Sequence, residues 1–465
     1  MKRITGSLLA GALVAVAILL PKPPESSGPE FTGPEPPSIG ASAISSLWHC
    51  AWLESGDVVD AAFLMASVPP SDVRISLPSA IPNEPLFEEE LAIIGPGSRV
   101  QNVSDLVRFG ASPGSVEFSD GPAAVAASVM SDRILSGDRC VRAVPKVWYM
   151  PGGTTREGRE LMVRVFNPFS DLAKVVIRGV SEFGEEPLPE LGDVLDVPSR
   201  SWIDIDLGEI APLLDDLLVI VEAQEGLVVP AMSLGAGESA DEAAWPGTGL
   251  STRWDFPIVT IDDLVPELVL ANPTPSPVTI EVDAYGILGA DPSILFDEVA
   301  PESQLRVPLP DTGGAPYGVR VTSSGSIAAV IVSESPVDLS GEDIVLSDNA
   351  VESIPELRIA GTVGAVSPAL SWLLPGAGSI QDAQESLWLM NTSDGSATVT
   401  IKPLGLRERA PEKTIVGSGM ISEVEISDDP GVTSYLVEST IPITVAWTAT
   451  DSAGTVFIAG VEIGD

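Results

Sequence analysis

Short segments in which apolar and polar residues alternate recur along this chain. In the segment 278–283, valine and isoleucine occupy every second position, with threonine, glutamate and aspartate between them. Alternation with a period of two places the apolar side chains on one face of a strand and the polar side chains on the other. The same pattern recurs at 71–77, 173–178 and 397–402. The sequence therefore predicts four strands that each have one buried face.

Two nearly continuous apolar segments follow each of the later alternating segments. They are 217–223 with 227–233, 317–323 with 327–333, and 434–440 with 443–450. Strands that are apolar on both faces are typical of the centre of a packed sheet. Frequent proline and glycine between short valine and isoleucine runs favour strands and turns over long helices. About seven short strands in roughly 100 residues fit a β-sandwich of the immunoglobulin or fibronectin type.

Four comparable units each begin with a tryptophan, and these residues are Trp48, Trp148, Trp254 and Trp372. In the last three units the tryptophan opens a Trp-x-x-Pro motif completed by Pro151, Pro257 and Pro375, whereas Ala51 stands at that position in the first. A turn follows 18 or 19 residues after each tryptophan, at 67–69 in the first unit and then at Asn167, Asn272 and Asn391. Self-similarity at a fixed period indicates a repeat array. Because the tryptophans recur at one place, packing is favoured over a ligand platform, which stays the alternative.

These repeats predict an all-β protein of tandem immunoglobulin/fibronectin-like β-sandwich domains after an N-terminal signal-anchor helix. The expected parts are a transmembrane signal-anchor at 1–21, a Pro-rich disordered stalk at 22–45, sandwiches at 46–144, 145–247, 248–345 and 370–465, and a linker or extra strand at 346–369.

The N-terminus carries Lys2 and Arg3 before an apolar run that ends at Leu20. This run is short for a membrane span and long for the core of a signal peptide. Prolines follow directly without a small-residue cleavage site, so an uncleaved signal-anchor is favoured over a cleaved signal peptide. The positive-inside rule then places the rest of the chain outside the cytoplasm, on a single-pass protein of the cell membrane. A cleaved segment would instead give a secreted protein.

The chain has two cysteines, Cys50 and Cys140. In an exported protein an even pair predicts a disulfide. Two thiols and one histidine are too few ligands for a closed zinc site, which is the weaker interpretation.

The formal net charge is −42 over 465 residues. Such a charge argues against a nucleic-acid partner, because that contact needs a basic face. A solvated acidic surface is the simplest explanation, and a cationic polymer, a basic partner or divalent cations remain open. Acidic pairs at 215–216, 262–263 and 428–429 raise the possibility of calcium at domain junctions, but their spacing does not match a calcium loop.

Candidate catalytic residues are few. His49 is the only histidine and lies next to Cys50, so an incidental strand residue is favoured over a general base. The sequence contains no G-x-S-x-G, P-loop, H-E-x-x-H or EF-hand pattern. The acidic pairs could serve a glycosidase, although they occupy unmatched loop positions. We therefore predict a protein that is not an enzyme and has no catalytic, cofactor or metal site.

The motif at 148–155, which reads WYMPGGTT, and the turn at 166–169, which reads FNPF, resemble an uncharacterised protein family. That family comprises secreted, membrane-anchored envelope proteins of high-GC Gram-positive bacteria and is described as a domain of unknown function. The resemblance implies a β-rich fold over most of 46–465 and a location in the cell envelope. It implies no activity.

The combined expectation is a membrane-anchored, extracytoplasmic β-repeat protein with a structural or protein-interaction role. Its partner would be an envelope protein or a cell-wall polymer. Binding of carbohydrate is the first alternative and would require exposed aromatic side chains on one face. A hydrolase is the second alternative and would require carboxylates clustered in a cleft.

Overall fold

The computed structural model describes residues 46–463 except 57–58, 79–85, 94–95, 107–109, 187, 189–190, 192–193, 236–241, 260–263, 336–357, 406–408 and 427–430. The predicted membrane segment 1–21 and stalk 22–45 lie outside these residues. No helix in the described part is long and apolar enough to cross a membrane. Nearly all regular structure there is antiparallel β-sheet, with one short helix, α2 (Leu207–Ile210). Residues 43–465 form one compact unit.

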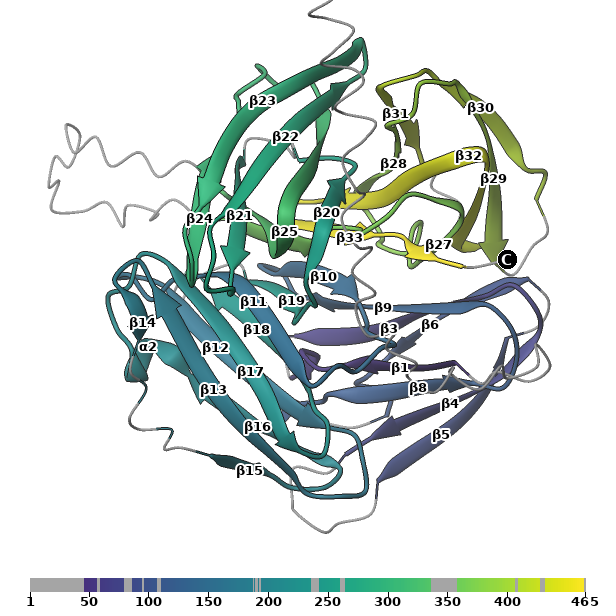
Figure 1. The fold of residues 1–465 in the computed structure, drawn as a ribbon. Coiled ribbons are helices and arrows are strands. Elements are labelled where there is room, and N and C mark those ends of the chain that lie inside the picture. The colour runs from purple at the N-terminus through teal and green to yellow at the C-terminus, as the bar shows by residue number, and fades with distance from the viewer. Residues whose placement is uncertain are drawn as a thin grey trace, which may run out of the picture. The chain divides into compact units, whose positions relative to one another are not determined.

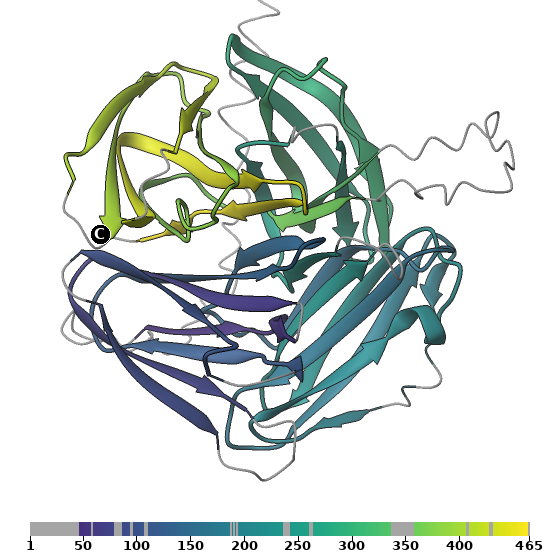
Figure 2. The same cartoon turned by 180° about the vertical axis from the view of Figure 1, so that it is seen from behind.

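The first repeat contains two four-stranded sheets (Figure 1, and from behind in Figure 2). In spatial order, one consists of β1 (Ser46–Cys50), β8 (Gly114–Phe118), β4 (Ser71–Leu77) and β5 (Phe87–Ile93). The other consists of β10 (Leu135–Arg139), β9 (Ala123–Met130), β3 (Asp60–Ser67) and β6 (Gly97–Asn102). A separate two-stranded sheet pairs β2 (Glu54–Ser55) with β7 (Gly110–Ala111).

The second repeat follows the same order. Its first sheet consists of β11 (Val147–Gly153), β17 (Leu217–Glu225) and β13 (Ala173–Ser181), with β14 (Gly184–Glu186) and β15 (Leu195–Val197) both paired to β13. Its second sheet consists of β16 (Ser201–Asp206), β12 (Glu160–Asn167), β18 (Val229–Gly235) and β19 (Glu242–Pro246).

In the third and fourth repeats one long strand serves both sheets. In the third repeat this strand is β25 (Tyr317–Glu334). Its first half pairs with β20 (Ser251–Phe256) and β22 (Val278–Gly286), and β22 pairs with β23 (Gly289–Val299). Its second half pairs with β21 (Val265–Asn272) and β26 (Ile359–Val363), and β21 pairs with β24 (Ser303–Pro308). In the fourth repeat the shared strand is β32 (Val432–Thr450). One sheet adds β27 (Ala369–Pro375) and β29 (Ala397–Gly405) to it, and these pair in turn with β34 (Val461–Glu462) and β30 (Glu412–Val416). The other sheet adds β28 (Gln384–Asn391) and β33 (Thr455–Ala459), and β28 pairs with β31 (Met420–Glu425).

All four repeats therefore share one plan of eight principal strands, one more than the sequence predicts. Numbered within a repeat, the first sheet runs 1-6-3-4 and the second runs 5-2-7-8. The all-β prediction is confirmed, but the immunoglobulin identity is not, because immunoglobulin sheets have the order ABED and CFG. The strand predicted within 346–369 is β26, which pairs with β25 as the eighth strand of the third repeat.

The two sheets of a repeat enclose an apolar core. In β4 the side chains of Val73, Ile75 and Leu77 are buried, while Asp72 and Arg74, which precede Val73 and Ile75, are exposed. A side chain at Gly114 of β8 would collide with Phe63 of the opposite sheet, because its Cβ would lie 2.6 Å from the ring. The alternation read from the sequence thus marks the inner face of each sandwich.

The turn asparagines fix the connection between the second and third strands. Asn272 is fully buried, and its Nδ2 donates to the carbonyl oxygens of Ser276, Val299 and Ala300 at 2.8–3.1 Å. Its Oδ1 accepts from the Thr274 N–H at 3.0 Å. Asn167 and Asn391 make corresponding bonds in the second and fourth repeats. The asparagine therefore joins this turn to the strand that follows the third.

We expect Asn272→Ala to lower the free energy of unfolding by about 1–3 kcal/mol, because it leaves buried carbonyl groups without donors. Thermal or urea unfolding followed by circular dichroism would measure this change. The matched control is Asn102→Ala, since Asn102 is only partly buried at the end of β6. Equal losses in the two variants would show that the buried network does not stabilise the turn.

Candidate functional site

The eighth strands of the four repeats pack against one another, and we call β10, β19, β26 and β33 the hub. Strand β10 contacts β19 and β33, and β26 contacts the same two strands, so the contacts form a closed cycle. Three of the hub strands lie close together in Figure 1, where β10, β19 and β33 are labelled. Their side chains are buried at almost every position.

Hydrogen bonds join hub strands of different repeats. The Ala244 N–H donates to Ser136 Oγ at 3.1 Å, which joins the second repeat to the first. The Val363 N–H donates to Asp138 Oδ2 at 3.2 Å, which joins the third repeat to the first. Polar contacts away from the hub also join neighbouring repeats. They include Arg164 to the Leu53 carbonyl, Arg306 to Asp216, Thr444 to Asp255, and Ser98 with Thr433.

Glycine allows the hub strands to approach closely. A Cβ at Gly361 would lie 2.6 Å from the ring of Trp245, which is itself fully buried. A Cβ at Gly137 would lie 2.6 Å from the side chain of Val456. These distances are shorter than real Cβ contacts, so a side chain at either position would force the facing residue of the other repeat to shift.

We expect Gly361→Ala to lower the free energy of unfolding by about 1–3 kcal/mol, because the added methyl group overfills the contact with Trp245. Urea unfolding monitored by tryptophan fluorescence would detect this. The control is Gly56→Ala, since a Cβ at Gly56 would meet nothing within 4 Å. If the two variants unfold at the same urea concentration, the hub contact is looser than described.

In each repeat the segment after the eighth strand returns to the first strand. Val141 pairs with His49, Thr248 with Tyr149, Ala365 with Asp255, and Val461 with Leu373. The residue before each returning residue is a glycine in three repeats, namely Gly247, Gly364 and Gly460, and Cys140 in the first.

The three glycines leave room for an aromatic ring. A Cβ at Gly364 would lie 2.8 Å from Phe256, and at Gly460 it would lie 3.0 Å from Trp372. In the first repeat Cys140 is bonded to Cys50, with a Cα–Cα distance of 4.7 Å. The predicted disulfide is therefore present, and it joins the first strand to the returning segment where the other repeats use packing.

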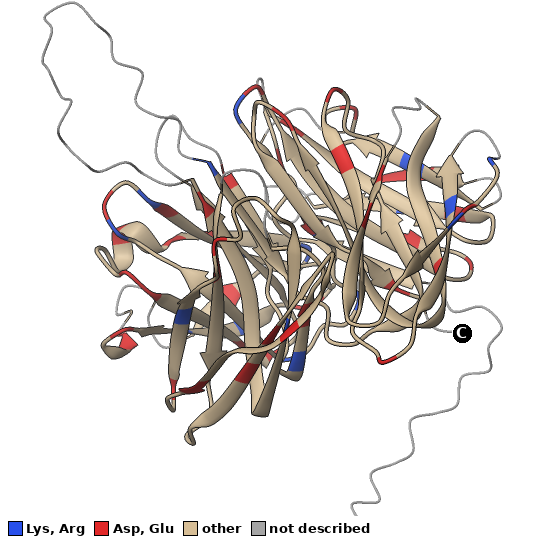
Figure 3. Ribbon diagram, turned by 90° about the horizontal axis from the view of Figure 1, so that it is seen from above, with Lys and Arg blue, Asp and Glu red and all other residues tan. Residues whose placement is uncertain are grey.

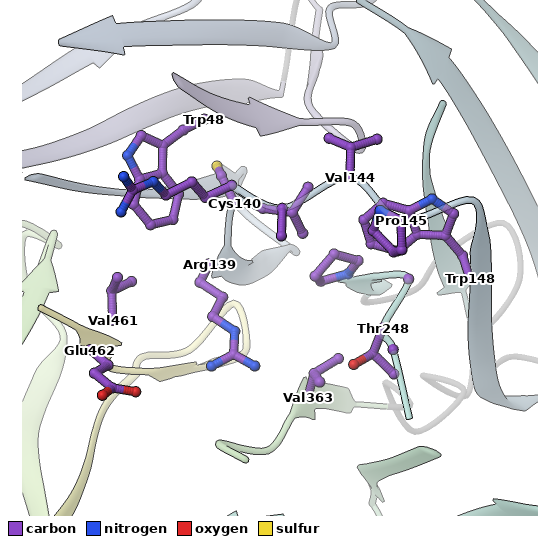
Figure 4. Close-up of a pocket in the computed structure, with 16 residues that line it drawn as sticks. Trp48, Arg139, Cys140, Val144, Pro145, Trp148, Thr248, Val363, Val461 and Glu462 are labelled. Atoms are coloured by element: carbon purple, nitrogen blue, oxygen red, sulfur yellow. The ribbon is translucent and has the colours of Figure 1, made fainter. Parts of the chain in front are cut away.

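A cavity of about 590 Å³ lies beside the C-terminal ends of the hub strands (Figure 4). All four repeats line it. The lining residues are Trp48 and 139–145 from the first, Trp148 and 246–249 from the second, Val363 from the third, and Val461 and Glu462 from the fourth. This volume is within the usual range of ligand sites, which is about 300–1,000 Å³. We take it as the candidate functional site.

The cavity is basic in an acidic protein. Acidic residues recur on strands and loops throughout the described chain, and basic residues are few (Figure 3). The cavity nevertheless carries Arg139 and Arg142 and only one carboxylate, Glu462. Arg139 donates to the Gly364 carbonyl oxygen at 2.7 Å. Arg142 is exposed and forms no ion pair with any residue that the structure describes.

Asp138 lies inside the hub next to this cavity. Its side chain is fully buried, and burial raises its pKa to about 7, against the lowering effects of Arg139 and of hydrogen bonds from Arg139, Val363 and Thr362. Burial also lowers the pKa of the Arg139 guanidinium. A carboxyl group that titrates near neutral pH therefore lies at a contact between the first and third repeats.

A smaller cleft between the first two repeats is rich in carboxylates. Its volume is about 310 Å³, and its lining includes Trp52, Glu54, Glu160, Arg164, Asp204 and Glu242. Arg164 pairs with Asp204 at 2.6 Å and with Glu54 at 3.7 Å. Burial raises the pKa of Glu242, while a hydrogen bond with Ser233 lowers it.

The only histidine has a structural environment. His49 is buried, its Nδ1 lies 2.7 Å from Ser115 Oγ, and its ring meets Phe166 and Phe169 edge-on. Burial lowers its pKa to about 4, so the ring is neutral near pH 7.

The tryptophans and prolines of the repeat motif are buried. Trp148, Trp254 and Trp372 each donate Nε1–H to a main-chain carbonyl at 2.9–3.0 Å, from Val228, Ile327 and Ile443 respectively. Trp48 is also buried, but its Nε1 has no hydrogen-bond partner in the described structure. Pro151, Pro257 and Pro375 are buried as well. Trp48 and Trp148 border the cavity, so two motif residues reach the candidate site.

Of the three acidic pairs noted in the sequence, the structure describes only the first, at 215–216. Asp216 pairs with Arg306 of the third repeat at 2.8 Å, so it takes part in a contact between repeats rather than a solvated loop. The pairs 262–263 and 428–429 lie outside the described residues. In the part of the chain that the structure describes, no group of three or more His, Cys, Asp or Glu is placed to hold a metal ion. Calcium at the junctions stays a prediction.

The sequence did not lead us to predict a role for Arg139 and Arg142, the two basic residues that line the cavity. No Asp or Glu occurs from Arg139 through Arg156, although the chain has 66 acidic residues in 465. That interruption is visible in the sequence and could have identified the segment. The contribution of Val363, Val461 and Glu462 could not be found, because only the fold brings them to it.

Comparison with known proteins gives a match to one family model and indicates no activity. No match was found among curated proteins. A family model described as "Family of unknown function (DUF5719)" matches residues 117–342, from β8 of the first repeat into the third. This agrees with the expected resemblance to a domain of unknown function, whereas the bacterial group and the envelope location stay predictions. Residues 117–342 are therefore similar to a domain of unknown function, DUF5719.

Proposed function

We propose that this protein is a membrane-anchored, extracytoplasmic interaction scaffold that binds a protein of the cell envelope and has no enzymatic activity. The observation that carries this proposal is the cavity to which all four repeats contribute. A single repeat could not form such a site. The repeat architecture therefore has a binding use beyond its own stability.

The disulfide supports a location outside the cytoplasm. Disulfides persist in oxidising compartments and are rare where thioredoxin and glutathione keep thiols reduced. Cys50 and Cys140 are both buried and bonded to each other. Together with the basic and apolar N-terminus, this supports a single-pass protein whose repeats face away from the cytoplasm.

The placement of the aromatic residues favours a protein partner over a carbohydrate. Carbohydrate binding would be expected to use exposed aromatic rings on one face. Eight of the nine tryptophans are buried, and Trp202 is only partly exposed. Phe183 and Phe296 are strongly exposed, but they belong to different repeats.

Photocrosslinking in intact cells tests the proposal. A benzoylphenylalanine at position 249 would place the photoreactive group at the edge of the cavity, where an added Cβ meets nothing within 4 Å. The same group at position 183 would lie on an exposed hairpin. The proposal predicts a reproducible protein adduct from position 249 that position 183 does not give. A polysaccharide adduct from position 249 would replace it with carbohydrate binding, and identical products from both positions would remove the cavity as the site.

A hydrolase is the second candidate, and the carboxylate cleft favours it. A buried acid with a raised pKa, such as Glu242, beside other carboxylates is the arrangement that glycosidases use. The test is release of reducing ends from purified cell-wall polysaccharide, with Glu242→Gln as the control. The scaffold account predicts no release. Release that Glu242→Gln abolishes would establish an enzyme.

A further inference from the structure

The segment that borders the cavity has a charge opposite to that of the whole chain. Arg139, Arg142, Lys146 and Arg156 occur in a stretch of 18 residues without a carboxylate, within a chain of net charge −42. Two of these cations line the cavity. In Figure 4 the Arg139 side chain extends into the space that Glu462, Thr248 and Val363 border.

The rest of the cavity wall is apolar. Valines and prolines make up much of it, with the edges of two tryptophans. The residues are Val141, Val144, Pro145, Pro246, Val363 and Val461. A wall of this kind binds an apolar body, and a few polar groups then orient the ligand. The arginines at the rim are the groups that could orient it here.

The size of the cavity and the overall charge decide between classes of anion. A polyanion would approach a surface of net charge −42 and be repelled over most of its length. A small ligand with one negative group avoids this, because charges beyond about 8 Å are largely screened at physiological salt. A volume of about 590 Å³ also suits a small ligand or the end of a chain.

We propose that the cavity binds a small amphiphilic anion, an apolar body that carries a single carboxylate or phosphate group. The apolar body contacts the valines, prolines and tryptophans, and the anionic group contacts Arg142 and Arg139 at the rim. This inference rests on the proposed use of the cavity as a binding site. It adds the chemical class of the group that a partner presents there.

Two fluorescent probes of nearly the same shape test the role of charge. Anilinonaphthalenesulfonate has an apolar body and one sulfonate, and N-phenylnaphthylamine has a similar body without the charge. We expect one binding site for the anionic probe on the full chain. Arg142→Glu should weaken its binding about tenfold and leave the neutral probe unchanged. Displacement by octanoate or by octyl phosphate would then tell a carboxylate ligand from a phosphate ligand.

Two matched variants complete the test. Arg133→Glu makes the same charge change at an exposed position that does not line the cavity, and it should leave both probes unaffected. Thr248→Phe should exclude both probes by filling the cavity. Circular dichroism would show that each variant folds. If Arg142→Glu does not fold, Arg142→Gln takes its place in the probe-binding test.

Equal binding of the anionic probe by Arg142→Glu and Arg133→Glu would overturn the inference, as would unchanged binding by Thr248→Phe. The proposed function is tested separately. If position 249 still captures a protein in cells while binding of the probes does not depend on Arg142, the scaffold proposal stands and the anionic ligand is ruled out. If position 249 captures nothing, the scaffold proposal is ruled out whatever the probes show.

Discussion

Replacing Cys50 and Cys140 together with alanine is expected to lower the free energy of unfolding by about 4–5 kcal/mol. The bond closes a loop across a sequence separation of 90 residues, and opening it returns that conformational entropy to the unfolded chain. Urea unfolding with and without a reducing agent would measure the change. Reduction should destabilise the wild-type protein by a similar amount and leave the double variant unaffected.

The other repeats supply a matched control for this result. Cys50→Met with Cys140→Gly introduces the residues of the second repeat, Met150 and Gly247, at the same places. We expect this variant to recover part of the packing and none of the closure entropy, so it should lie between the wild type and the double alanine variant. A wild-type protein with two free thiols by mass spectrometry would contradict the whole prediction.

Asp138→Asn is expected to become more stable relative to the wild type as the pH rises from 4 to 8, by on the order of 4 kcal/mol. The pKa of Asp138 is about 7 in the folded protein, against 3.8 for the ordinary group. Between these values the folded state holds a proton that the unfolded state has released. The contribution of Asp138 to stability is therefore present below pH 4 and is lost as the pH rises through 7.

The measurement is the difference between the two unfolding free energies at several pH values. His49 acts with the opposite sign, because its lowered pKa of about 4 makes stability fall as the pH drops from 6.5 to 4. That effect is common to both proteins and cancels in the difference. Asp132→Asn, at an exposed position before β10, is the control for the replacement of an aspartate by asparagine. A constant difference for Asp138→Asn would mean that its carboxyl titrates normally.

The sequence predicted the parts of the fold that depend on local patterns. Alternation at 71–77 and 278–283 identified strands with one buried face. The turn asparagines recur in the sequence because the last three repeats use the same side-chain hydrogen bonds to main-chain carbonyl groups at this turn. The eighth strands were harder to identify. The segments 242–246 and 359–363 do not alternate, because each packs between two sheets from other repeats and is buried on both faces.

The candidate site could be predicted only in part. The disulfide between Cys50 and Cys140 was predicted because an exported chain with two cysteines is expected to pair them. The partners of Asp138 and Arg139 did not, since Val363 and Gly364 lie more than 220 residues away in the chain. Contacts of this separation arise because the hub joins strands from all four repeats. No local pattern reports which repeat will meet which.

Calorimetry on the full chain tests most directly whether the four repeats form one unit around the hub. If they do, the repeats unfold together, and the van't Hoff enthalpy should equal the calorimetric enthalpy in a single transition. Four repeats that unfold independently would give a ratio of about one quarter, or separate transitions. The hub account predicts a ratio close to one, and a ratio near one quarter would contradict it.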